Sequence, residues 1–154
     1  MNKRLALRLF LLVFGAFMYG CEGENNSESI GNTKIKKSRD SYIEAFNQKN
    51  MLLFSSLWTE GAIYKNLNTN ETIQGKSQIM THFKNQFDRN NTILEWVVES
   101  VEQKNSSKII EKAVLIFSNV SKPEERRAFE AIYIKKNGHW LIEKLSEVQI
   151  VAVP

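Results

Sequence analysis

Apolar residues recur at helical spacing through the first half of the chain. Residues 35–46 show a period of three to four, with Arg39 at the edge of the stripe, and predict a helix. The nearly all-apolar stretch 51–58 predicts a short buried helix with Asn50 as its N-cap, and 76–88 predicts a third helix. The apolar stripes of the first and third helices are Ile35, Tyr42, Ile43, Phe46, Ile79, Met80, Phe83 and Phe87.

The second half of the chain has the alternation typical of β-strands. Strands are predicted at 62–67, 72–74, 94–99, 112–117, 126–136 and 139–151. The strand at 112–117 is apolar on both faces, which favours a central position in the sheet. Asn137-Gly138 predicts a two-residue type I′ hairpin turn, and 122–124 predicts another turn. Helices followed by antiparallel strands indicate an α+β domain.

Residues 1–20 have a different pattern. Lys3, Arg4 and Arg8 precede an apolar run, residues 9–19, which is followed by Gly20 and Cys21. This arrangement is typical of a secretory signal peptide, and the run is shorter than the roughly 20 residues that span a bilayer. Met18-Tyr19-Gly20-Cys21 resembles the lipobox of bacterial lipoproteins, although that motif usually has Leu first and a small residue second.

The resemblance implies cleavage before Cys21 and lipid attachment to its thiol, so the protein is expected to be bound to a membrane of the bacterial envelope. Glu22 favours the outer membrane if the cell is Gram-negative. The alternative is an ordinary signal peptide in which Cys21 is incidental. The Gly-, Ser- and Asn-rich segment 22–33 is expected to be a flexible tether, with residues 34–154 as the folded domain.

Processing would also change the charge of the chain. The full sequence has 21 Lys and Arg against 17 Asp and Glu, but three cations lie in the predicted signal peptide, which leaves 18 − 17 = +1. This balance does not favour a nucleic-acid partner. A single cysteine also excludes an internal disulfide.

The order of the predicted elements resembles the nuclear transport factor 2-like superfamily, and its SnoaL-like bacterial members in particular. The resemblance rests on the segments 42–50, 57–64 and 73–79, and covers residues 33–152. It implies a cone-shaped, cystatin-like roll in which three N-terminal helices pack on a strongly bent antiparallel sheet, with a pocket at the open end. Because this superfamily includes enzymes, adaptors and domains without activity, the function has to be argued from the site.

Candidate acid–base groups are few. Glu95 and Glu99 share one face of a strand but lie roughly 13 Å apart, which is too far for a coupled pair. His82 lies at the flank of the third helix and is the candidate general base, since histidine titrates near neutral pH. His82 and His139 are isolated, so neither a metal site nor a cofactor is expected.

The aromatic residues offer a candidate binding site. Trp58, Tyr64, Tyr133 and Trp140 carry polar groups that need partners, and they are expected to edge a cavity together with His82. The leading hypothesis is a lipid-anchored, non-catalytic domain that binds a small apolar or amphipathic ligand or a protein partner. One alternative is an isomerase- or dehydratase-type enzyme that uses His82 for proton transfer. Another is an interaction module that forms a homodimer through the open face of the sheet.

Overall fold

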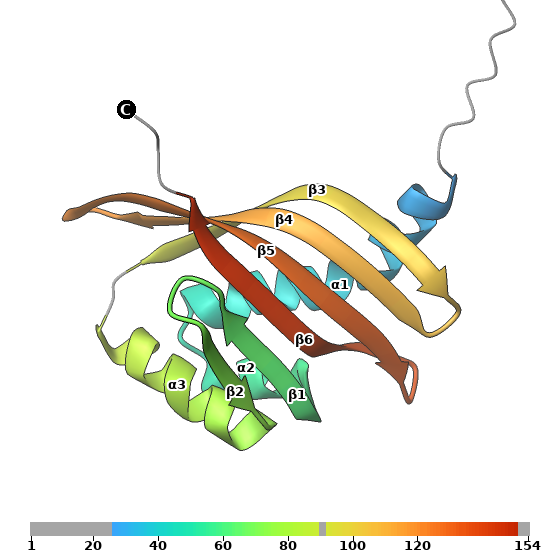
Figure 1. Ribbon diagram of the computed structural model, residues 1–154, viewed down its shortest axis with the longest axis horizontal. Helices are drawn as coiled ribbons and strands as arrows, with labels where there is room; N and C mark the ends of the chain where they lie inside the picture. Colours follow the sequence, from blue (N-terminus) through green and yellow to red (C-terminus); the bar gives the residue numbers. More distant parts are fainter. Residues whose placement is uncertain (1–25, 90–91, 151–154) are drawn as a thin grey trace, which may run out of the picture.

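The computed structural model describes residues 26–89 and 92–150, so Cys21 and the predicted signal peptide lie outside the described residues (Figure 1). The helices and strands follow the α+β order expected from the sequence. They are α1 (Asn26–Asn47), α2 (Met51–Ser56), β1 (Trp58–Asn66), β2 (Glu71–Gln74), α3 (Lys76–Arg89), β3 (Ile93–Asn105), β4 (Lys108–Asn119), β5 (Lys122–Lys136) and β6 (His139–Ile150).

The six strands form one curved sheet in the order β2-β1-β6-β5-β4-β3. Strands β3 to β6 are an antiparallel meander, as expected. The sheet is not antiparallel throughout, because β1 pairs with β6 in the parallel direction. The three helices line the inner face of the sheet, and its outer face is uncovered within the described residues (Figure 1).

The hairpin between β5 and β6 has the expected geometry. Asn137 and Gly138 have φ angles of 50° and 81°, and the flanking residues Lys136 and His139 are paired. Two consecutive left-handed residues are what a type I′ turn requires, which explains the Asn-Gly sequence. This prediction is confirmed.

Helix α1 begins at Asn26, so 26–33 is helical, although these residues were expected to belong to the tether. Gly31 explains the difference, because it is buried where α1 crosses β3. A Cβ at this position would lie only 3.1 Å from Val101 Cγ1. The glycine therefore allows a close approach between helix and sheet, and it is not a sign of a flexible linker.

Two element boundaries differ from the sequence-based prediction. Trp58 starts β1 rather than ending α2, because the Leu57 carbonyl accepts a hydrogen bond from the Ile142 N–H at 2.8 Å and the chain joins β6 there. Residues 122–124, expected as a turn, form the first part of β5 beside its hairpin with β4. Pro123 is tolerated close to the strand start because few ladder bonds are needed there. Asn50 is confirmed as the N-cap of α2, since Oδ1 accepts from the Leu53 N–H at 3.0 Å.

Aromatic side chains fill the space between helices and sheet. The Phe54 ring centroid lies 4.8 Å from that of Tyr42 and 4.9 Å from that of Phe83, and Trp58 packs on the same group. Such short spacings leave no room for a large internal cavity. The described core runs from Ile35 to Leu145 as one cluster, so the domain is expected to fold without residues 1–21. Within the described part of the chain, no helix combines the length and apolar character needed to cross a membrane.

Candidate functional site

The four aromatic residues expected at a cavity edge are core residues instead. Trp58, Tyr64 and Tyr133 are at most 1% exposed and Trp140 is 7% exposed. None of the four lines either of the two cavities described below. The polar groups of three of them point inward: the Tyr64 and Tyr133 hydroxyls bind carboxylates, while Trp58 Nε1 is buried with no hydrogen-bond partner in the described residues.

The first of these carboxylates belongs to Glu111, which is fully buried on β4. Its Oε1 lies 2.7 Å from Arg39 Nε, and its Oε2 accepts a hydrogen bond from the Tyr133 hydroxyl at 2.9 Å. Arg39 also donates to Asn32 Oδ1 at 2.9 Å. Burial raises the pKa of Glu111, while Arg39 and Tyr133 act in the opposite direction. Because every group in this cluster has a partner, we interpret it as a device that fixes α1 on the sheet.

The second carboxylate, Glu147 on β6, belongs to a network that reaches the surface. Its Oε1 accepts from the Tyr64 hydroxyl at 2.7 Å and from Arg127 Nη1 at 2.6 Å. Arg127 Nε donates to Glu125 Oε1 at 2.7 Å, and its guanidinium carbon lies 4.7 Å from the centre of the Phe117 ring. Burial disfavours the Arg127 charge, but Glu147 and Glu125 outweigh it and raise the Arg127 pKa. Arg127 is therefore a fixed cation.

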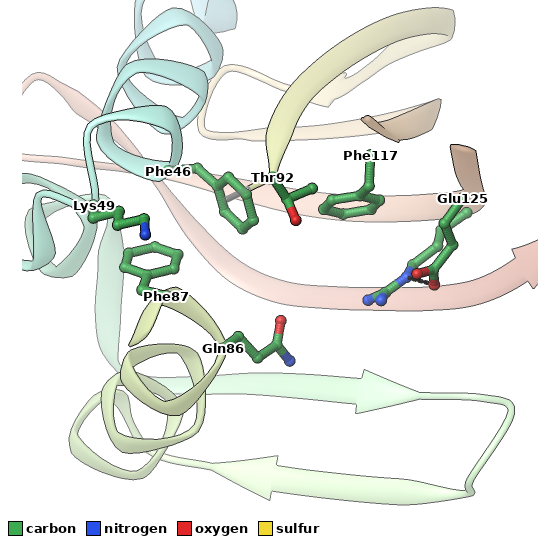
Figure 2. Close-up of a pocket in the computed structure, with 8 residues that line it drawn as sticks. Phe46, Lys49, Gln86, Phe87, Thr92, Phe117 and Glu125 are labelled. Atoms are coloured by element: carbon green, nitrogen blue, oxygen red, sulfur yellow. Dashed lines mark hydrogen bonds and ion pairs between the residues drawn. The ribbon is translucent and has the colours of Figure 1, made fainter. Parts of the chain in front are cut away.

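Arg127 forms part of the wall of a small cavity of about 50 Å³ (Figure 2). The cavity lies between the C-terminal ends of α1 and α3 and the adjoining ends of β3, β4 and β5. Three phenylalanine rings form its apolar part, and polar or charged side chains complete it. The lining residues are Phe46, Lys49, Gln86, Phe87, Thr92, Phe117, Glu125 and Arg127.

The position of the cavity is fixed by a contact between α1 and β3. The Asn47 side chain donates to the Leu94 carbonyl at 3.1 Å and accepts from the Leu94 N–H at 2.7 Å. Both backbone groups of Leu94 are thus satisfied by one amide, next to the point where β3 begins. The rings of Phe46 and Phe87 also meet, with centroids 5.0 Å apart. Two of the three rings that line the cavity are therefore packed against each other.

His82 lies behind the cavity wall rather than in it. Its Nε2 is 2.7 Å from the Gln86 side-chain nitrogen, and Gln86 is the residue that faces the cavity. The His82 ring packs on Tyr64, with centroids 5.1 Å apart. Direct proton transfer to a ligand in this cavity is not supported by that arrangement, because His82 does not reach it. His139 is exposed at the β5–β6 turn.

A second depression lies between α2 and α3. It is an open groove of about 620 Å³ with exposed Leu52 and half-buried Met51 and Met80. Lys76 in this groove is paired with Glu60. In the described ranges, no group of three His, Cys, Asp or Glu side chains is arranged to hold a metal ion.

Solved structures with the same architecture identify the fold. A domain of unknown function with a cystatin-like fold from Nostoc punctiforme superposes with a TM-score of 0.70 at 18% identity, covering 81% of this chain and 80% of that one. An NTF-2-like protein of unknown function from Shewanella oneidensis gives 0.69 at 11% identity, covering 76% and 98%. The chain has the nuclear transport factor 2-like, cystatin-like fold.

A ketosteroid isomerase-like protein from Erwinia carotovora atroseptica has the same nuclear transport factor 2-like fold, with a TM-score of 0.67 at 13% identity, covering 78% and 96%. No family model matches the sequence, and no curated protein is significantly similar to it. Identities this low establish the fold alone. The chemistry of the site therefore has to be inferred from this chain's own residues.

Proposed function

We propose that this protein is a membrane-anchored, non-catalytic binding domain of the bacterial cell envelope. The anchor would be lipid on Cys21, which is supported by the basic and apolar segment before it and by its resemblance to a lipobox. Glu22 favours the outer membrane in a Gram-negative cell. Mass spectrometry of the mature N-terminus tests this: lipid on Cys21 is expected, and an unlipidated cut elsewhere would contradict the anchor.

The ligand we propose is a small amphipathic molecule, or the small head of a larger one. The observation that carries this is the cavity beside Arg127, because three phenylalanine rings face a cluster of polar groups across one opening. Apolar walls with a few convergent polar groups are the usual composition of a small-molecule site. A volume of about 50 Å³ is far below the roughly 300 Å³ of ordinary ligand pockets, so only a small group would enter.

Ethanol and acetate are suitable probes, since both are small enough for this volume and they differ in charge. Titration followed by NMR is expected to shift the signals of Phe46, Phe87 and Phe117. Phe117→Ala, which removes a half-buried ring from the wall, should abolish the shifts at Phe46 and Phe87. Met80→Ala, which shortens a half-buried side chain on α3 outside this cavity, is the control and should leave them unchanged. Absence of any shift at the three rings would refute the site.

A protein partner is the second candidate, and the outer face of the sheet favours a second copy of the chain. Val97, Val114, Ala128 and Val148 are register neighbours across β3, β4, β5 and β6 and form an apolar row. Val97 and Val148 remain 50% and 38% exposed. Homodimers bury apolar surfaces of this kind, typically with about 800 Å² from each partner.

Sedimentation of the domain tests the dimer directly. A mass twice that of one chain is expected, and Val97→Lys with Val148→Lys should return it to the monomer, because two charges would be buried at the interface. Leu52→Lys, at an 85% exposed position on α2, is the matched control. A monomeric mass for the unaltered protein at high concentration would exclude this candidate.

A further inference from the structure

Lysine side chains gather at the end of the domain where α1 begins. Lys34, Lys36 and Lys37 are exposed on the third and fourth turns of α1. Lys34 Nζ donates to Gln103 Oε1 at 2.8 Å, which places this part of α1 beside the end of β3. The sequence alone does not reveal the cluster, because its other members lie about 70 to 100 residues further along the chain.

These other lysines lie around two neighbouring β-turns. Lys104 and Lys108 flank the β3–β4 turn, and Lys135 and Lys136 precede the β5–β6 turn. The Lys135 N–H donates to the Ser107 carbonyl at 2.9 Å, so the two turns are in direct contact. Figure 1 shows both turns at the same end of the molecule as the start of α1.

We call the region around these seven lysines the basic end; they are Lys34, Lys36, Lys37, Lys104, Lys108, Lys135 and Lys136. It differs in charge from the rest of the protein. The described acidic residues exposed there are Asp40 and Glu102, which are bound to Lys36 and Lys104 respectively. Seven lysines less two carboxylates leave +5, whereas the whole chain from Cys21 onward carries only +1. The remainder is therefore net acidic. One further carboxylate, that of Glu28, belongs to the first turn of α1 and lowers the charge of this end to +4, although its side chain lies outside the described residues.

We propose that the basic end binds the anionic headgroups of the membrane to which the protein is anchored. The proposal rests on the proposed function for the membrane anchor. Asn26 is five residues after Cys21, a span of at most about 18 Å, so a lipid on Cys21 would hold this end near the bilayer. Lysines within a Debye length of an anionic surface, about 8 Å in physiological salt, are attracted to it.

The orientation of the domain relative to the membrane follows from the length of β3. Thr92 at the cavity and Asn105 at the basic end are thirteen residues apart, or roughly 40 Å along the strand. With the basic end on the bilayer, the cavity would lie at the end of β3 that is far from the membrane. The ligand would then be taken from the aqueous compartment rather than from the lipid phase.

The test uses the chain from residue 22 onward, which contains the complete described core and carries no lipid. Its sedimentation is measured with vesicles of phosphatidylcholine alone and with vesicles containing about one third phosphatidylglycerol. Binding is expected only to the anionic vesicles, and it should weaken as salt is raised towards ~0.15 M. Each lysine near such a surface contributes about fivefold in affinity, so Lys108→Gln with Lys135→Gln and Lys136→Gln should weaken binding at least tenfold.

Lys65→Gln with Lys84→Gln and Lys144→Gln is the control, because it removes the same charge from β1, α3 and the middle of β6. It should change binding less than twofold. Equal losses in both triple variants, or no binding to anionic vesicles, would overturn the proposal. Mass spectrometry of Cys21 decides the anchor separately, so a failure of the anchor and a failure of the basic end give different results.

Discussion

Replacement of Arg39 by methionine is expected to destabilise the domain strongly. Arg39 is 8% exposed and lies 2.7 Å from a fully buried carboxylate, that of Glu111. Removing one member of a buried ion pair typically costs about 3–5 kcal/mol, because the remaining charge loses its partner but stays out of water. Total stability of a domain is usually about 5–15 kcal/mol, so this single change would remove a large part of it.

The size of the loss comes from the unpaired charge, and a combined variant can show this. Arg39→Met with Glu111→Leu and Tyr133→Phe removes the ion pair and also the hydroxyl that donates to Glu111 at 2.9 Å. Apolar replacements of whole buried ion pairs are often neutral or stabilising. The triple variant is therefore expected to be within about 2 kcal/mol of the unaltered protein, and several kcal/mol more stable than Arg39→Met alone.

Urea unfolding followed by tryptophan fluorescence measures both variants. Burial already raises the Glu111 pKa, and loss of Arg39 removes an opposing influence. A carboxyl group whose pKa is higher in the folded state than in the unfolded state favours folding at low pH, and this contribution is lost as the pH rises through the folded pKa. The loss in free energy of unfolding caused by Arg39→Met should therefore become smaller as the pH is lowered. A loss below about 1 kcal/mol, or a triple variant no more stable than the single one, would refute the reasoning.

Three further changes test local features of the fold, the first of them next to the cavity. Asn47→Ala leaves the N–H and the carbonyl of Leu94 without their partner and should cost about 1–3 kcal/mol in urea unfolding, whereas Asn47→Asp, which keeps the acceptor, should cost less. Asn137→Val forces a β-branched residue to a φ of 50° and should lower the thermal midpoint, with Asn137→Gly as the tolerated control. Asn50→Ala removes the N-cap of α2 and should cost about 1 kcal/mol, and an unchanged midpoint would contradict the role of the cap.

Local patterns were sufficient to predict most of the fold. The stripe over 76–88 matches α3, and Asn137-Gly138 defines a real hairpin, because both features depend on residues close together in the sequence. Gly31 shows where such reasoning fails. A glycine in a polar segment resembles a linker, and only the position of β3, seventy residues later, shows that it is a packing position.

The site was harder to predict than the fold. The aromatic residues selected from the sequence are core residues, since the polar groups of the two tyrosines found partners inside the protein. Glu111 and Glu147 were missed, although a signal exists: each shares the inward face of its strand with buried apolar neighbours, Ile109 and Leu145. A carboxylate in an inward position predicts a buried partner, but the identity of that partner depends on tertiary contacts.

The parallel pairing of β1 with β6 also has a consequence for the order of folding. Strand β1 is hydrogen-bonded only to β2 and to β6, the last strand. The edge of β1 that pairs with β6 therefore stays unpaired until residues 139–150 have been synthesised. Contacts of such long sequence separation make folding slow and place its completion after synthesis of nearly the whole chain. Until β3 to β6 have been synthesised, the N-terminal helices lack most of the sheet on which they pack in the folded domain. Late completion of the sheet would suit the proposed export of this chain, since a polypeptide has to be unfolded to be threaded through a membrane pore.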